Sequence, residues 1–161
     1  NPELKMTIKV ETVLTLKNKF KNMKEFEYYG LFLTDKCKET LMNWINDNGY
    51  YNPNGKYYLD HCTLLHRSQK NEDVLSFCEF WEGAKFVMRI TAIGKSNKAM
   101  AFKVELSEAT CANANPHITI CTFESGKPVD SNKIYDWVEI PVMNVTGILR
   151  SVKHSIKRNL M

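Results

Sequence analysis

The chain has 161 residues, of which 43% are hydrophobic and 25% charged, and its formal net charge is +4. This composition is ordinary for a soluble globular protein of about one domain. No apolar run approaches the roughly 18 residues that a membrane span needs. The five cysteines are odd in number and lack C-x-x-C spacing, which argues against a disulfide framework and a zinc site and favours buried, reduced thiols in a cytosolic or nuclear protein.

The predicted elements begin with a partly alternating stretch at 9–17, KVETVLTLK, which indicates a strand. The aromatic and apolar stretch at 27–33, EYYGLFL, predicts a buried strand. A helix is predicted over 34–49, because Thr34 or Asp35 can cap its start and Asn-Gly ends it. After the turn NPNG, residues 55–66 predict another strand.

Strands and helices also alternate in the second half. A capping start, an apolar stripe and a final glycine predict a helix over 71–83. Further strands are predicted at 84–94 and 100–108, as a hairpin around the turn KSNK, at 117–123 and at 142–151, with a short helix at 130–139. This order of elements predicts an α+β fold with a mainly antiparallel sheet.

The net charge is unevenly distributed. Residues 16–24, LKNKFKNMK, and 150–159, RSVKHSIKRN, are basic with apolar residues interleaved. Either stretch can track the phosphates of a nucleic acid, or it can be a solvated face or a frayed end. The first residues, NPELKMTIKV, lack a start methionine and the apolar core of a signal peptide. We therefore expect a single domain over 1–161 that is a fragment of a longer protein.

Two histidines stand in matching strand contexts. His61 and Thr63 lie in YYLDHCTLL, and His117 and Thr119 lie in PHITICTF. Alternation along a strand predicts that His61, Thr63 and Leu65 share one face, and that His117, Thr119 and Cys121 share another. If the two faces meet at one cleft, one imidazole can take a proton while the other supplies one, and the hydroxyls can hold phosphate oxygens.

The same spacing also occurs by chance, because three of the four histidines have a serine or threonine two positions later. The third case, His66 with Ser68, stands where the strand gives way to polar residues, so we expect these side chains to be held less rigidly. Two unrelated histidines, each satisfied by a neighbouring hydroxyl, remain the alternative to a convergent pair.

The two H-x-T motifs resemble those of the two-histidine (2H) phosphoesterase superfamily. Within it the chain is similar to the catalytic domains of the 2',3'-cyclic-nucleotide 3'-phosphodiesterases. YYGLFLTDKCKETL, HCT, AKFVMRITAIGKSNKAMAFKVELSE and HIT carry the likeness, in this order, between residues 26 and 123. The segment GKPVDSN resembles a related branch, the cyclic-phosphodiesterase domain of fungal tRNA ligases.

This resemblance implies a two-lobed fold with antiparallel sheets around a central cleft and helices outside. It implies hydrolysis of 2',3'-cyclic phosphates of nucleotides or RNA ends to 2'-phosphates, without metal or cofactor. His61, Thr63, His117 and Thr119 fall on the catalytic set, with His61 as acid and His117 as base. Tyr28 falls on an aromatic residue near the substrate. His66 stands where the family has a phenylalanine beside the base, which is a departure, although an imidazole can also stack.

Two alternatives stay open. The domain can be the end-healing module of a tRNA-ligase-like RNA repair protein, or a non-catalytic RNA-binding domain of the same fold. The intact histidines and threonines of both motifs argue against the second. The resemblance also implies an upstream kinase-like domain in a full-length chain and a cytoplasmic location, and it is compatible with membrane association of that longer protein.

Overall fold

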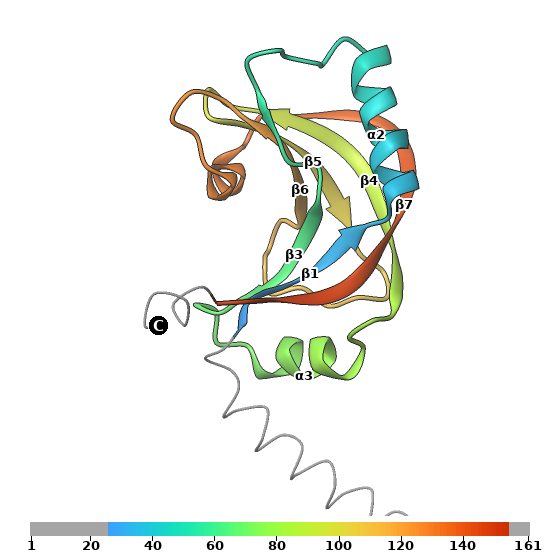
Figure 1. Cartoon of the computed structure of the whole chain (residues 1–161), viewed down its shortest axis with the longest axis vertical. Helices are drawn as coiled ribbons and strands as arrows, with labels where there is room; N and C mark the ends of the chain where they lie inside the picture. The colour runs from blue at the N-terminus through green and yellow to red at the C-terminus, as the bar shows by residue number, and fades with distance from the viewer. Residues whose placement is uncertain (1–25, 155–161) are drawn as a thin grey trace, which may run out of the picture.

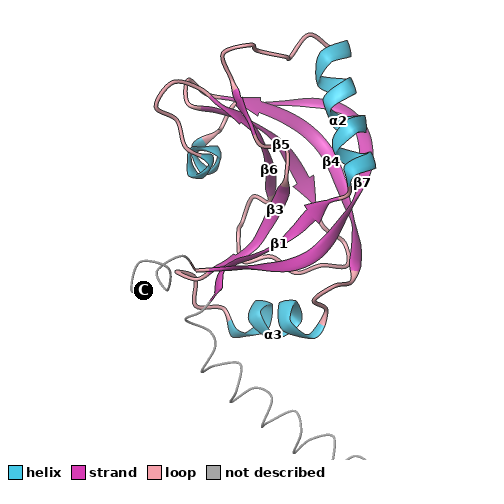
Figure 2. Cartoon of the chain, in the orientation of Figure 1, coloured by secondary structure: helices cyan, strands magenta, loops and turns pink. Residues whose placement is uncertain are grey.

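The computed structural model describes residues 26–154. The strands of this part of the chain are β1 (Phe26–Leu33), β2 (Lys56–Tyr57), β3 (His61–His66), β4 (Lys85–Lys95), β5 (Ala99–Glu105), β6 (His117–Thr122) and β7 (Trp137–Lys153). The helices are α2 (Asp35–Asp47), α3 (Glu72–Phe80) and the 3-10 helix η1 (Pro128–Lys133), as Figure 2 shows by colour. The strand predicted at 9–17, the basic stretch at 16–24 and residues 155–159 lie outside the described residues.

The strands form a closed antiparallel barrel. The order is β6-β3-β1-β7-β4-β5, and β5 pairs with β6 to close the ring (Figure 1). The long β7 pairs with β1 along one part and with β4 along another, so it bridges two sides of the barrel. The α+β class and the antiparallel sheet are confirmed. The predicted two lobes are not seen, because pairing between β5 and β6 joins the strands into one barrel.

Most predicted elements are confirmed, and their caps explain their bounds. The side chain of Thr34 accepts a hydrogen bond from the N–H of Cys37, and Asn71 caps α3 in the same way through Val74. Such caps satisfy N–H groups that have no partner within the helix. Two predictions are wrong. Residues 55–66 form two strands, because Leu59 adopts a positive φ of 44° between them. The helix predicted over 130–139 is η1 only, and β7 already begins at Trp137.

A β-bulge follows the threonine of each H-x-T motif. Thr63 pairs with Gly30 and Leu65 with Tyr29, so β3 carries Leu64 as an extra residue. In the same way Ala101 of β5 pairs with Thr119 and Met100 with Cys121, so β6 carries Ile120 as an extra residue. A bulge resets the alternation of side chains. The predictions that Leu65 shares the face of His61, and that Cys121 shares the face of His117, are therefore wrong, and both residues are fully buried.

The hydrophobic core lies inside the barrel and under the two α-helices. Leu31, Met88, Ile90, Phe102, Ile118 and Leu149 are among its fully buried strand residues. Helix α2 packs on this core through Leu41 and Ile45, and α3 packs on it through Val74, Leu75 and Cys78. The core leaves the outward face of β3 and β6 free for polar side chains. None of the helices between residues 26 and 154 is long and apolar enough to cross a membrane.

Candidate active site

The two H-x-T motifs lie on neighbouring antiparallel strands. Cys62 of β3 pairs with Ile118 of β6, and both side chains are buried. Continuing this register by one residue sets Thr63 beside His117 and His61 beside Thr119, on the opposite face. Directly opposed residues have Cβ atoms about 5 Å apart and diagonal ones about 7–8 Å. The four side chains thus form a compact quadrilateral with the two imidazoles on one diagonal.

All four side chains line one pocket of about 600 Å³. Tyr28 and His66 line it as well, so every site residue predicted from the sequence faces the same space. The other lining residues are Glu27, Tyr58, Asp60, Ser68, Gln69, Asn113, Pro128, Val129 and Asn132. The structure brings the predicted residues together, while their catalytic and binding roles stay predictions.

His61 is held by hydrogen bonds at both ring nitrogens. Its Nδ1 lies 3.1 Å from Asp60 Oδ2, and its Nε2 lies 3.1 Å from Thr63 Oγ1. Because a carboxylate only accepts, Nδ1 carries a proton. The hydrogen bond from His61 is the main cause that holds the pKa of Asp60 below its usual value; burial opposes it, and Lys38, whose Nζ lies 3.2 Å from Asp60 Oδ1, adds to it. The carboxylate thus stays ionised beside the ring and holds it in a fixed orientation.

Aromatic rings fix the plane of His61. Its ring stacks on Tyr28 with 4.7 Å between centroids, and on Phe32 with 5.0 Å. Gly30 lies between these two residues on β1. A Cβ at Gly30 would come within 3.0 Å of the carbonyl oxygen of Cys62 and 3.2 Å of His61 Cδ2. The missing side chain of Gly30 therefore makes room for the imidazole.

His117 has a different environment. Its Nδ1 donates to the backbone carbonyl of Asn115 at 3.0 Å. A carbonyl only accepts, so the neutral ring has its free lone pair on Nε2. Burial lowers the pKa of His117; the Asn115 carbonyl opposes this, and the nearby His61 adds to it. The neutral form of His117, which can accept a proton, is thus favoured near neutral pH.

Thr119 is connected to the 3-10 helix η1. Its Oγ1 lies 2.9 Å from the Oγ of Ser131, whose side chain is buried. Thr63 is fixed through its backbone, because the side chain of Asn113 donates to its carbonyl at 3.3 Å. Helix η1 and the loop before β6 thus fix the positions of Thr119 and Thr63, respectively.

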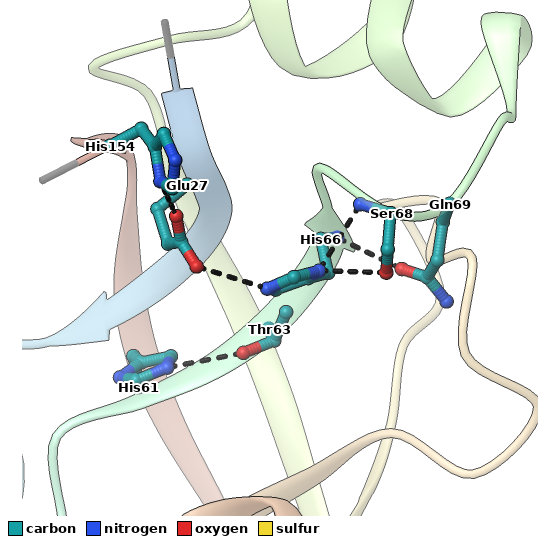
Figure 3. A network of polar contacts seen from close by, with 7 residues as sticks. All are labelled: Glu27, His61, Thr63, His66, Ser68, Gln69 and His154. Atoms are coloured by element: carbon teal, nitrogen blue, oxygen red, sulfur yellow. Dashed lines mark hydrogen bonds and ion pairs between the residues drawn. The ribbon is translucent and has the colours of Figure 1, made fainter. Parts of the chain in front are cut away.

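A second polar network lies at one end of the pocket (Figure 3). Glu27 accepts from Nε2 of His66 at 3.3 Å and from Nδ1 of His154. The N–H of Ser68 donates to Nδ1 of His66 at 3.1 Å, which fixes the tautomer with the proton on Nε2. His66 and Ser68, which were expected to be held less rigidly, are both hydrogen-bonded in the structure. The bulge at Leu64 turns His66 toward the pocket, and Glu27 and Ser68 hold it there.

Glu27 remains ionised in this network. Burial raises the pKa of its carboxyl group, but the hydrogen bonds and electrostatic interactions with His154 and His66 outweigh that cost and lower the pKa below its ordinary value. No group of three or more histidine, cysteine, aspartate or glutamate side chains suited to a metal ion is found between residues 26 and 154.

Three side chains that hydrogen-bond to the predicted site residues were not predicted from the sequence: Asp60, Ser131 and Glu27. Asp60 directly precedes His61 and was readable as a partner of that ring. The roles of Ser131 and Glu27 could not be predicted from a local pattern, because their partners Thr119 and His66 are distant in the sequence and come close only in the folded chain.

Comparisons with known proteins bear on this site. A family model described as the fungal tRNA ligase phosphodiesterase domain matches residues 82–152. That stretch is less than half of the 161 residues; it contains His117 and Thr119 but neither His61 nor Thr63. No curated protein sequence matches the chain.

Among solved structures, the crystal structure of a fungal RNA kinase is similar. The TM-score is 0.51 at 15% sequence identity, and the match covers 81% of this chain and 44% of the other. At this identity the likeness shows the fold alone, and the chain spans less than half of that protein. The segment from 82 to 152 is thus similar to the phosphodiesterase domain of fungal tRNA ligases, and the chain shares its fold with part of a fungal RNA kinase structure.

Proposed function

We propose that the protein hydrolyses 2',3'-cyclic phosphates at RNA ends and leaves a 2'-phosphate. The observation that carries this proposal is the convergence of His61, Thr63, His117 and Thr119 on one pocket from two paired strands. The similarity of residues 82–152 to a tRNA ligase phosphodiesterase domain supports it. That similarity also favours RNA ends over free cyclic mononucleotides as the substrate.

The reaction forms one bond to phosphorus and breaks another. A water oxygen attacks phosphorus, and the bond from phosphorus to the ribose 3'-oxygen breaks on the opposite side. The water gives a proton to one imidazole, and the leaving oxygen takes a proton from the other. The hydroxyls of Thr63 and Thr119 donate to the two nonbridging oxygens as negative charge develops there.

The environments of the two rings support different roles. His117 is partly buried, has a lowered pKa and offers a free lone pair on Nε2, which suits the base. His61 is held at Nδ1 by Asp60 and at Nε2 by Thr63, so its Nε2 is fixed in the pocket beside a phosphate-binding hydroxyl, which suits the acid. This assignment agrees with the one implied by the family resemblance.

The nucleoside of the terminal residue fits the end of the pocket formed by Tyr28 and His66. Glu27 and Ser68 fix the ring of His66, so a base can stack on it without an entropic cost for ordering that side chain. The amides of Gln69 and Asn113 bond to each other at 2.8 Å and line the same end, where they can meet polar edges of a base.

The test uses a short RNA that ends in a 2',3'-cyclic phosphate. Phosphorus NMR of the products follows the cyclic resonance and the monoester that replaces it. We expect a 2'-phosphate, and we expect EDTA to leave the rate unchanged because two imidazoles carry both proton transfers. An unchanged cyclic resonance, with RNA binding retained, would favour a non-catalytic RNA-binding domain. A 3'-phosphate product would exchange the roles of His61 and His117.

A further inference from the structure

A second hollow, of about 710 Å³, lies on the other side of η1 from the catalytic pocket. It is lined by the turn between β4 and β5 and by the segment after η1: Lys95, Ser96, Asn97, Lys98, Asp130, Lys133, Tyr135 and Asp136. Pro128, Val129 and Asn132 of η1 face the catalytic pocket, while Asp130 and Lys133 face this hollow. The short helix η1, drawn in orange in Figure 1, therefore contributes residues to both spaces and lies between them.

Three lysines and two aspartates line the hollow, and within residues 26–154 two of the lysines have no carboxylate partner. Among the described residues, Lys95 and Lys98 form no ion pair; Lys95 lies over the ring of Phe123, and Lys98 donates to the hydroxyl of Ser125 at 2.5 Å. Lys133 is 79% exposed at its side chain and lies 3.8 Å from Asp130. Asp130 is itself engaged, because it accepts from the backbone N–H of Lys127.

Lys95 and Lys98 belong to an ordered turn between β4 and β5. Ser96 accepts from the N–H groups of Lys98 and Ala99, and the carbonyl of Lys98 accepts from the N–H of Phe123 at 2.9 Å. A Cβ at Gly126 would come within 2.2 Å of the same carbonyl oxygen, so the loop after β6 packs directly on the turn. The backbone that carries Lys95 and Lys98 is therefore held in place.

Tyr135 adds an aromatic surface to these charges. It is 86% exposed, although its neighbour Ile134 is buried against Ala99 and Ala101. The backbone is therefore anchored while the ring stands in solvent. Cationic grooves with an exposed aromatic ring are the usual means of binding single-stranded nucleic acid, because the cations track phosphates and the ring stacks on a base of any sequence.

We infer that Lys95, Lys98, Lys133 and Tyr135 bind the nucleotides that precede the reacting end of an RNA strand. The identity of the strand rests on the proposed function. A helix with its side chains is about 10 Å across, so a strand of a few nucleotides spans η1. The carboxylates of Asp130 and Asp136 direct the phosphates toward Lys95 and Lys98. A free cyclic mononucleotide fills only the catalytic pocket and cannot use this surface.

The experiment compares two substrates of the full chain: 2',3'-cyclic AMP and a hexanucleotide with the same cyclic end. We expect a higher kcat/KM for the hexanucleotide. Tyr135→Ala should lower the ratio of the two kcat/KM values about 10-fold, within the range for one base stacked on a ring. Tyr135→Phe keeps the ring and should restore the ratio.

The lysines are tested in the double variant Lys95→Gln, Lys98→Gln. The control, Lys85→Gln with Lys36→Gln, removes the same charge elsewhere, because Lys85 stands about 33 Å away along β4 at ~3.3 Å per residue. Binding of a labelled hexanucleotide with a 2'-phosphate end is followed by fluorescence anisotropy. The variant Lys95→Gln, Lys98→Gln should weaken binding. It should also reduce the slope of the logarithm of the binding constant against the logarithm of salt concentration by about 0.7 per lost phosphate contact. The control variant should change the affinity and this slope less.

The outcomes separate the surface from the catalytic proposal. Hydrolysis of both substrates with equal kcat/KM would overturn the RNA surface and leave the proposed function intact. If neither substrate is hydrolysed, the proposed function fails, and binding decides about the surface: weaker binding by Tyr135→Ala supports it, and unchanged binding overturns it. Displacement of the hexanucleotide by polyglutamate in preference to unlabelled RNA would assign the surface to an acidic protein and overturn the inference.

Discussion

The ring of His61 is oriented by contacts that the H-x-T motif does not contain. Asp60 fixes the proton on Nδ1, Lys38 holds Asp60, and the rings of Tyr28 and Phe32 fix the plane. A general acid must present its proton in a fixed direction, and partners that orient a histidine are commonly worth about 10- to 100-fold in activity. Asp60 is thus a positioning residue for the proposed acid.

Asp60→Asn should lower kcat/KM about 10- to 100-fold, the size seen when a metal-bound histidine loses its partner. The loss should fall on kcat and not on KM, because Asp60 acts by orienting the ring of His61. Asp47→Asn, an exposed position at the end of α2, is the control. A raised KM with an unchanged kcat would show that Asp60 does not act through the proposed acid.

Gly30→Ala tests the space under His61. The new Cβ would lie 3.0 Å from the Cys62 carbonyl and 3.2 Å from His61 Cδ2, and the ring is the part that can move. We expect kcat to fall on the order of 100-fold, as for a displacement of about 1 Å in an active site. Denaturation by urea should show a loss of roughly 1–3 kcal/mol, typical of overpacking. Wild-type kcat in a folded variant would contradict this role.

At the scale of elements, the bulges at Leu64 and Ile120 explain both a success and a failure of the sequence-based predictions. Alternation correctly set His61 beside Thr63 and His117 beside Thr119, because each motif ends before its bulge. The same rule misplaced Leu65 and Cys121 because a bulge inserts one residue without a change in composition. Helices α2 and α3 were predictable from their caps, since the capping residues act within one turn.

Closure of the barrel was not predictable in the same way. Pairing of β5 with β6 depends on residues more than ten positions apart and on the path of the loop between them. The contact from Ser131 to Thr119 is a similar case, because it joins η1 to β6 after both have formed. Local patterns carry little information about such partners.

Ser131→Ala tests the support that η1 gives to the site. The variant removes the hydroxyl that lies 2.9 Å from Thr119 Oγ1 in a buried position. We expect the free energy of unfolding to drop by about 1 kcal/mol, the usual value of one hydrogen bond, and turnover to fall with it as Thr119 loses its fixed rotamer. Ser76→Ala, exposed on α3, is the control. Equal turnover in the two variants would show that Thr119 needs no such support.

At the scale of the whole molecule, burial of neutral His117 links the stability of the fold to pH. Its pKa is lowered in the folded state, so the unfolded chain binds more protons as pH falls below the ordinary histidine value of about 6.5. The contribution of His117 is therefore complete above that value and is lost as pH falls toward the folded pKa.

His117→Gln removes this dependence. Urea unfolding at pH 7.5 and 5.5 should show that the wild type loses more stability than the variant between the two values, because only the wild type has a histidine here that binds a proton more readily in the unfolded chain. Parallel losses in the two proteins would mean that His117 titrates alike in the folded and unfolded chains.

The central claim is that His61 and His117 act together on one phosphorus atom. The most direct measurement is single-turnover hydrolysis of the cyclic-phosphate RNA by wild type, His61→Ala, His117→Ala and the double variant, each shown to be folded by its thermal transition. Each single variant should lose on the order of 10²- to 10⁴-fold in rate, and the double variant should be little slower than either, because the two groups serve one transition state. Near-normal turnover in either single variant, or losses that multiply in the double variant, would contradict the account.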